Sequence, residues 1–267
     1  MRNFSLLKFL ALLLMAVCSA TLSMAQNVAQ NEAKIGTTEY ATLEEAVNSV
    51  EQGKKGYIYI LADASFDELR IEGKQIIINL QNHTVTGSKI DVYGKEGPAT
   101  YLKILDSKAK GLSVNIKDNY SVSYTASGTL ELTGSITAYE GAKIMVESGK
   151  VVSTTNFALL AYGDKTGQSD VASSIEVTGG YVKAQEGCVS PRGKGAAATI
   201  SGAAVLESLD NAAVMGNGTY NDYEKLGGTS ITIMGKCWLI GRIQTSGYAA
   251  CGIYHPQQGT LTIKYNA

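Results

Sequence analysis

The chain has 267 residues, of which 45% are hydrophobic and 18% are charged, and its 23 Lys and Arg residues nearly balance its 24 Asp and Glu residues. No block of basic residues occurs, so the composition argues against a nucleic-acid partner. The 29 glycines beside only 3 prolines suit short strands joined by tight turns rather than a disordered chain. We therefore expect one or two folded domains that are rich in β-structure.

The first 25 residues have the pattern of a secretory signal peptide. Arg2 and Lys8 give the chain a positive start, and the apolar run FLALLLMAVCSA follows them. The small residues Ser23 and Ala25 then precede a candidate cleavage site. The apolar run is too short for a comfortable membrane span, so no span is expected in the mature chain. Removal of residues 1–25 leaves 21 basic against 24 acidic residues, a net charge of −3.

A signal peptide predicts that the mature protein is secreted, periplasmic or attached to the cell surface, and the sequence leaves these destinations open. The polar residues 26–33 are expected to form a disordered linker before a folded domain at 34–267. An alternative is that Cys18 is the lipid-bearing cysteine of a lipoprotein. Val17 precedes Cys18 where that signal requires a small residue, so this alternative is the less favoured one.

Three cysteines remain after cleavage, at positions 188, 237 and 251. An oxidising compartment permits disulfides, and Cys237 and Cys251 are the pair closest in sequence. The favoured interpretation is that all three are small apolar side chains in a packed interior. A disulfide between Cys237 and Cys251 is left open.

A short amphipathic helix is predicted at about 42–51. Thr42 and Glu45 form a T-x-x-E capping box. The following apolar residues recur at the spacing of one helix face, and they are Leu43, Ala46, Val47 and Val50. The stretch YIYIL at 57–61 then reads as a strand. A helix of this length is marginal alone, so we expect it to cover the open end of a stack of strands.

The rest of the chain repeats. Four segments place an aliphatic residue directly before a tight turn of small residues, and these residues are Val146, Val177, Ile200 and Ile233. In each segment an apolar residue follows five positions later, at Val151, Val182, Val205 and Trp238. A second column pairs a small residue with an aliphatic one, at 158–159, 188–189, 213–214 and 252–253. The spacings are 31, 23 and 33 residues in the first column and 30, 25 and 39 in the second. Two columns with irregular spacing indicate similar coils with loops of different length between them.

This pattern predicts a solenoid, because one coil cannot bury its own apolar side whereas stacked coils can. Inward residues would align in ladders, and glycines would mark the corners. The favoured fold is therefore all-β, a single-stranded right-handed parallel β-helix with a short N-terminal capping α-helix. An antiparallel β-sandwich explains the alternation equally well, but it does not explain why the second column follows the first in coil after coil.

The segments YATLEEAVNSV…GYIYIL and IEVTGGYVKA resemble the capping helix, first strand and coils of right-handed parallel β-helix proteins of the pectate-lyase-like superfamily. The resemblance covers about 34–267 and extends to uncharacterised secreted and surface proteins of gut bacteria. It implies a fold rather than an activity, since the superfamily includes lyases, glycoside hydrolases, esterases and non-catalytic adhesins.

No catalytic residue, metal site or cofactor is expected. Glycoside hydrolysis requires two carboxylates at one cleft, and the chain has neither Asp-Asp nor Asn-Thr-Asp. The acidic residues Asp63, Asp67, Glu68 and Glu72 are read as a solvated strand edge rather than as a calcium site. No Cys and His spacing typical of a metal site occurs.

Neither the two histidines nor the loop at 163–167 is expected to take part in catalysis or in phosphate binding. His83 and His255 are predicted to lie in surface turns, since neither has a nucleophile motif beside it. The loop GDKTG at 163–167 lacks the full spacing of a phosphate-binding loop.

Tyrosine is the residue type that suggests a binding site, since 15 Tyr stand against 4 Phe and 1 Trp. Several tyrosines fall on loops that follow the second column and should leave the solenoid on one side. Aromatic rings with nearby carboxylates suit a sugar ring and its hydroxyls. The candidate ligand-binding strip is Tyr162, Asp164, Tyr220, Asp222, Tyr223 and Tyr254. Tyrosine serving only as a strand-edge residue is the competing and more conservative interpretation.

We therefore expect a secreted, non-catalytic scaffold that binds a polysaccharide or a cell-surface glycan, as an adhesin does. One alternative is a diverged polysaccharide lyase or glycoside hydrolase. Another is a structural module that forms a homodimer through its C-terminal coil, because the final strand TLTIKYNA has no evident cap.

Overall fold

The structure is a computed structural model that describes residues 30–94, 97, 99–117, 120–164, 168–217, 227–242, 251–254 and 258–264. The chain divides into two units, Met1–Gln30 and Asn31–Ala267, and the account below concerns the second. The expected signal peptide lies outside the described residues.

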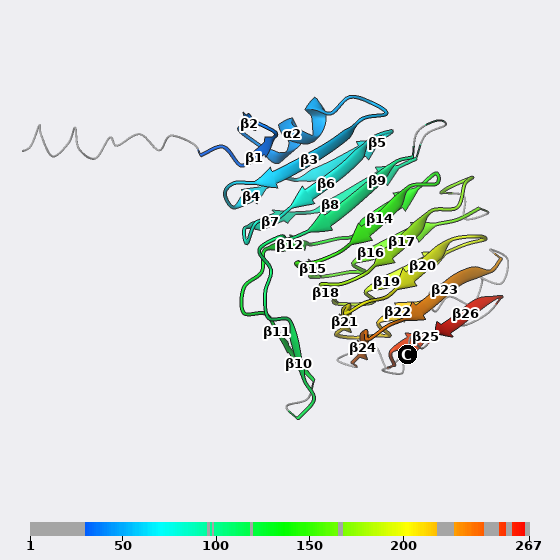
Figure 1. Cartoon of the computed structure of the whole chain (residues 1–267). Coiled ribbons are helices and arrows are strands. Elements are labelled where there is room, and N and C mark those ends of the chain that lie inside the picture. Colours follow the sequence, from blue (N-terminus) through cyan, green and yellow to red (C-terminus); the bar gives the residue numbers. More distant parts are fainter. Residues whose placement is uncertain are drawn as a thin grey trace, which may run out of the picture. The chain divides into compact units, whose positions relative to one another are not determined.

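Three sheets account for nearly all the regular structure of the second unit (Figure 1). In spatial order, sheet A contains β2 (Thr38–Tyr40), β1 (Ala33–Ile35), β3 (Lys55–Ile60), β6 (Gln75–Asn79), β9 (Tyr101–Leu105), β14 (Lys143–Val146), β17 (Ser174–Val177), β20 (Ala197–Ile200), β23 (Thr229–Met234) and β26 (Gly259–Lys264). Sheet B contains β24 (Trp238–Gly241), β21 (Val205–Ser208), β18 (Tyr181–Ala184), β15 (Lys150–Ser153), β12 (Thr129–Leu132), β7 (Thr84–Gly87) and β4 (Ala64–Ser65). Sheet C contains β25 (Ile253–Tyr254), β22 (Val214–Met215), β19 (Val189–Arg192), β16 (Leu159–Tyr162), β13 (Ile136–Tyr139), β8 (Lys89–Tyr93) and β5 (Glu68–Glu72).

From β3 onward the chain visits the sheets in the order A, B, C, and then returns to sheet A beside its previous pass. We call each such pass a coil. Every strand in the three sheets after β3 pairs in parallel with the equivalent strand of the neighbouring coil. Parallel neighbours exclude the antiparallel sandwich and are consistent with a parallel β-helix solenoid. Residues 174–192, for example, hold one strand for each sheet, namely β17, β18 and β19.

Both columns seen in the sequence are ladders of paired residues. In sheet A, Val146 pairs with Val177, and the register continues through Ile200 to Ile233. In sheet C, the residues that align are Leu159, Val189, Val214 and Ile253. Nearly all of these side chains are buried in one apolar core formed from all three sheets. Alternation along each strand thus sends every second side chain into that core.

One detail of the expected alignment is wrong. Three residues separate Val177 from β18, whereas four separate Ile200 from β21. The register therefore pairs Val182 with Leu206 rather than with Val205. Because one extra residue reverses the face of a strand, Val205 and Trp238 point away from the core, and their neighbours Leu206 and Leu239 take the inward positions.

The N-terminal helix forms as predicted and is slightly shorter. Helix α2 spans Leu43–Ser49, and the side chain of its N-cap Thr42 accepts a hydrogen bond of 3.1 Å from the backbone of Glu45. Its apolar face joins the main core, and Lys74 Nζ donates to the carbonyl of Val47 near the other helix end at 3.1 Å. The helix packs against β1, β2 and β3 and so covers the first coil.

The folded unit begins earlier than the expected boundary at residue 34. Strand β1 starts at Ala33, which is fully buried and pairs antiparallel with Ile60. Glu32 accepts hydrogen bonds from the backbone of Leu61 and, through its carboxylate, from the backbone of Leu43. The end of the predicted disordered linker is therefore ordered.

A two-stranded arm interrupts the third coil between sheets A and B and was not predicted. Its strands β10 (Ser113–Asn115) and β11 (Ser121–Ser123) pair antiparallel, and the arm runs along the stack toward β24 (Figure 1). Its apolar side chains cover the outer face of sheet B: Leu112, Val114, Val122 and Tyr124 pack against Tyr181, Val205 and Ile240. This cover explains why the outward-facing Val205 is only 2% exposed.

Among the described residues, no helix has the length and apolar character needed to cross a membrane.

Candidate functional site

The strands of sheet C that precede the predicted binding loops end along a single edge of the stack. Strands β16, β19, β22 and β25 are successive parallel neighbours, so their carboxyl-terminal ends lie along one edge of sheet C. Tyr162 ends β16, Asp164 follows two residues later, and Tyr254 ends β25. Tyr220, Asp222 and Tyr223 lie outside the described residues. Of the six candidate residues, the structure therefore places three.

Tyr162 and Asp164 lie close together, whereas Tyr254 is distant from them. Three coil steps separate β16 from β25, which is about 14 Å at the usual spacing of neighbouring strands. Tyr254 also does not continue the register of Tyr162, since Tyr254 pairs with Met215 whereas Tyr162 pairs with Arg192. The described part of the predicted strip is therefore a local pair with one remote member.

A column of three stacked tyrosines on sheet C is the most regular feature near this edge. Tyr93, Tyr139 and Tyr162 end β8, β13 and β16, and we call them the tyrosine column. The ring centroids of Tyr93 and Tyr139 are 4.6 Å apart with an interplanar angle of 11°, and those of Tyr139 and Tyr162 are 5.4 Å apart at 19°. The backbone register that pairs Tyr93 with Tyr139 sets the first spacing.

Arginines occur at both ends of the column but act differently. The guanidinium of Arg70 lies 3.8 Å from the ring centroid of Tyr93 and also bonds the Glu72 carboxylate at 3.1 Å. Arg192 pairs in register with Tyr162, but its guanidinium lies 4.7 Å from the ring centroid of Phe157 instead. Arg70 thus stacks on the end of the column, whereas Arg192 lies across the outer face of sheet C.

The central tyrosine is held in its protonated form. Burial raises the pKa of Tyr139 to about 12, with further contributions from the carboxylate of Asp91 and the neighbouring phenols. At neutral pH its hydroxyl therefore remains a hydrogen-bond donor. Asp91 itself pairs with Lys89, at 3.2 Å, on the same outer face.

The stacking decides which parts of the rings can meet a ligand. Because the rings face one another along the stack, their faces are largely occupied, and only their edges and hydroxyls are left for a ligand. The chemistry offered is a row of phenol groups at the spacing of the coils. A polar ligand such as a sugar, which can hydrogen-bond to the phenol groups, suits such a row better than a flat ligand that must stack on a ring face.

The loops beside the column are joined to one another by backbone hydrogen bonds. Asp164 and Lys194 exchange both backbone bonds at 3.1 Å. The carboxamide of Asn217, only 1% exposed, accepts from Gly193 N at 2.7 Å and donates to Gly227 O at 2.9 Å. The described parts of this edge are therefore tied together from coil to coil.

Tyr93 and Tyr139 were missed by sequence reasoning although a signal for them exists. Each tyrosine of the column ends a short strand directly before a glycine or a Glu-Gly pair, as in Tyr93-Gly94, Tyr139-Glu140-Gly141 and Tyr162-Gly163. Alignment of the earlier coils on this pattern would have added both residues to the strip.

The acidic residues near the N-terminal coil lie apart or in ion pairs. Glu68 pairs with Lys89 at 3.1 Å, and Asp63 lies 3.6 Å from Nδ1 of His83. No group of three or more potential metal ligands among His, Cys, Asp and Glu occurs in the described ranges. His255 lies outside the described residues.

Cys188, Cys237 and Cys251 are free thiols. Cys188 is completely buried, and Cys237 and Cys251 are half-buried. Burial raises the pKa of all three thiols. The packed-interior interpretation therefore holds for Cys188, and the structure contains no bridge between Cys237 and Cys251.

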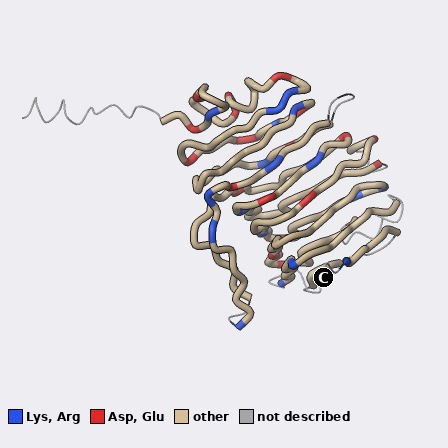
Figure 2. Tube along the Cα trace, in the orientation of Figure 1, with Lys and Arg blue, Asp and Glu red and all other residues tan. Residues whose placement is uncertain are grey.

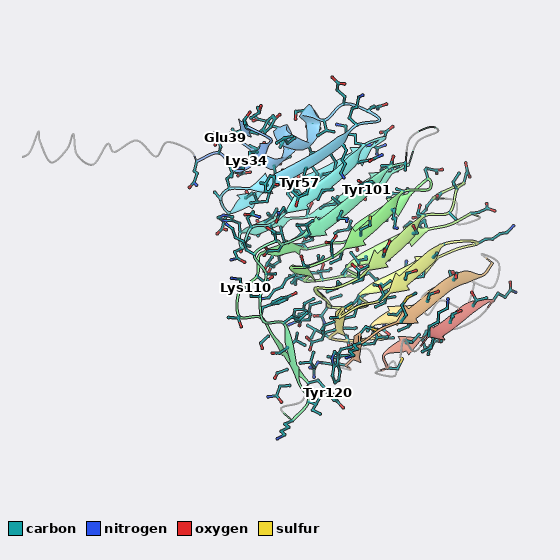
Figure 3. All side chains as sticks on the ribbon, viewed as in Figure 1. Lys34, Glu39, Tyr57, Tyr101, Lys110 and Tyr120 are labelled. Atoms are coloured by element: carbon teal, nitrogen blue, oxygen red, sulfur yellow. The ribbon has the colours of Figure 1, made fainter. Side chains whose placement is uncertain are left out.

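The outer face of sheet A carries a second set of polar and aromatic side chains. Lys103 pairs with Glu147 at 2.8 Å, and Lys143 pairs with Glu176 one coil further along. Tyr57 and Tyr101 lie on the same face (Figure 3). Positive and negative residues are interspersed over the visible strands, without a patch of one sign (Figure 2).

A scan against protein-family models and searches of curated proteins and of solved structures found no significant match to this chain.

Proposed function

We propose that the mature protein is a secreted or surface-exposed, non-catalytic right-handed parallel β-helix that binds an extended glycan along the tyrosine column. The repeated A, B, C order of the sheets supports a single-stranded solenoid. Crossover connections between parallel strands are right-handed in nearly all proteins, which supports the hand. A relationship to the pectate-lyase-like superfamily rests on the resemblance of the capping segment and of the coils.

The observation that carries the proposal is the spacing of the tyrosine column. Centroid separations of 4.6 and 5.4 Å are close to the length of one sugar ring in an extended chain. Successive phenol groups would thus meet successive sugars of a linear polymer. Asp91 and Asp164 flank the column and add acceptors for sugar hydroxyls.

The test compares two sets of hydroxyl deletions. A chain that begins at residue 26 is screened on a glycan array, and hits are measured by calorimetry. The triple variant Tyr93→Phe, Tyr139→Phe, Tyr162→Phe keeps the stacked rings and removes the hydroxyls. At about 1 kcal/mol for each hydrogen bond, the affinity should fall roughly a hundredfold.

The matched control removes three phenol hydroxyls from sheet A, at Tyr57, Tyr59 and Tyr101. This variant should bind within about twofold of the unaltered protein, less than 0.5 kcal/mol. An equal loss in both variants, or the absence of any glycan hit, contradicts the proposal.

A lyase or hydrolase remains the second candidate because of the sheet A ion pairs. A lysine beside a carboxylate and a tyrosine is a combination that proton abstraction can use. Incubation with a panel of polyuronides and neutral polysaccharides tests it. Release of unsaturated or reducing sugar that Lys103→Met and Lys143→Met abolish would favour this candidate over a binding scaffold.

A further inference from the structure

Large apolar side chains are exposed on the last coil of the stack. Trp238 on β24 is 41% exposed, Tyr254 on β25 is 38% exposed, and Leu261 and Ile263 on β26 are 39% and 69% exposed. One coil earlier, Ile231 and Ile233 pair with Leu261 and Ile263 and are 0% and 6% exposed. Leu261 and Ile263 therefore occupy inward core positions that the described residues leave uncovered.

The strand edges are open at the same place. Strands β24, β25 and β26 are the terminal members of sheets B, C and A, and each is paired on one side only. All six residues of β26 are exposed. An unpaired edge of this length with apolar side chains is a template for pairing with another strand.

The opposite end of the stack is closed. Strand β1 pairs antiparallel with β3 and is itself covered by β2, and α2 packs its buried residues against this end. Figure 1 shows α2 beyond β3 and β26 at the far side of sheet A. In the described residues the stack thus has one open end, and two such ends can close into a pair, whereas a filament requires two complementary ends.

We propose that the open end binds a second copy of this chain, head to head, about a two-fold axis normal to sheet A. Such an axis makes the two β26 strands antiparallel and keeps Leu261 and Ile263 on the core side in both copies. Leu261 of one copy then lies opposite Ile263 of the other, and Thr262 lies opposite Thr262.

The charges and the remaining strands fit this arrangement. Lys264 of one copy is opposite Thr260 of the other, so no like charges meet across the strand pair. The same rotation exchanges the positions of sheets B and C, which brings β24 of one copy beside β25 of the other. Trp238 and Tyr254 would thereby be covered together with the core positions of β26.

The oligomeric state tests the pairing. The chain that begins at residue 26 is measured by light scattering and sedimentation over a range of micromolar concentrations, and a dimer is expected. Ile263→Glu should give a monomer that still folds, because the Ile263 side chain is exposed in a single copy of the chain. Val171→Glu is the matched control, since Val171 is 57% exposed on a loop away from this end, and it should stay dimeric.

A cross-link tests the register. Directly opposite residues in an antiparallel pair have Cβ atoms about 5 Å apart, so Thr262→Cys should form a disulfide-linked dimer on oxidation. Thr232→Cys, one coil further inside, should not. A dimer that forms normally with Ile263→Glu would overturn the proposal. A monomer at every concentration would also overturn it, and protection of β26 amides from exchange in that monomer would show that another segment of the chain covers this end.

Discussion

Nε of Arg242 lies 2.6 Å from Oε1 of Glu207, on the outer face of sheet B beneath the β10–β11 arm. The hydroxyl of Tyr181 donates to the other oxygen of the same carboxylate, and Nη2 of Arg242 donates to the carbonyl of Tyr120 on the arm at 3.0 Å. The ion pair therefore joins two coils to an arm that is 122 residues away in sequence. Because the Glu207 side chain is only 8% exposed, its charge depends on these partners.

Replacement of Glu207 should destabilise the fold strongly. Glu207→Gln leaves the Arg242 guanidinium without its carboxylate under the arm, and the free energy of unfolding should fall by about 3 kcal/mol. Glu147→Gln breaks the Lys103 pair on the open face of sheet A and should cost about 1 kcal/mol or less. Chemical denaturation of both variants measures the difference, and equal losses would show that the arm does not bury the ion pair.

A glycine at the corner between sheets A and B should not tolerate a side chain. Gly180 has φ +77°, and an added Cβ would lie 2.8 Å from the carbonyl oxygen of Gly149 in the neighbouring coil. Gly180→Ala combines backbone strain with a clash against backbone, so a loss of roughly 3 kcal/mol or more is expected. Gly36→Ala has a similar φ of +58° but open space around the Cβ, and it should cost about 1–2 kcal/mol. Thermal melts of the two variants would contradict this account if Gly36→Ala proved the more harmful.

The thiols should differ in reactivity. In the native protein without residues 1–25, Cys237 and Cys251 should react with a thiol reagent, whereas Cys188 should react only after denaturation, because it is completely buried. Mass spectrometry of labelled peptides identifies the sites. Recovery of a Cys237–Cys251 linked peptide before reduction would contradict the free thiols seen in the structure.

Alkaline pH should destabilise the protein through its buried tyrosines. Burial raises the pKa of both Tyr124 and Tyr139 to about 12, above the value of about 10 in an unfolded chain. The folded state then keeps protons that the unfolded state has lost, so stability is unaffected below about pH 10 and falls as the pH rises toward 12. Ultraviolet titration should show late-ionising phenols, and Tyr139→Phe should remove one of them. A titration complete near pH 10 in the folded protein would refute the assignment.

Part of the tyrosine column could have been predicted. Tyr162 and Asp164 were identified because they follow a recurrent apolar pair, and that pair is a true ladder of sheet C. Tyr93 and Tyr139 were missed because the earlier coils were not aligned to the same register. Tyr93 and Tyr139 are 46 residues apart in sequence because the β10–β11 arm lies between them, yet their strands β8 and β13 are direct neighbours in sheet C.

The sequence by itself determined the repeating unit of this protein. Alternating apolar residues and turn glycines act within one coil, so the inward ladders and the capping helix could be predicted from local patterns. Only the tertiary structure decided which outward side chains meet, such as Arg242 with Tyr120 and Tyr93 with Tyr139. Outward neighbours come from different coils, and the lengths of the turns between strands set their register. One extra residue in a turn was enough to exchange Val205 for Leu206 in the core.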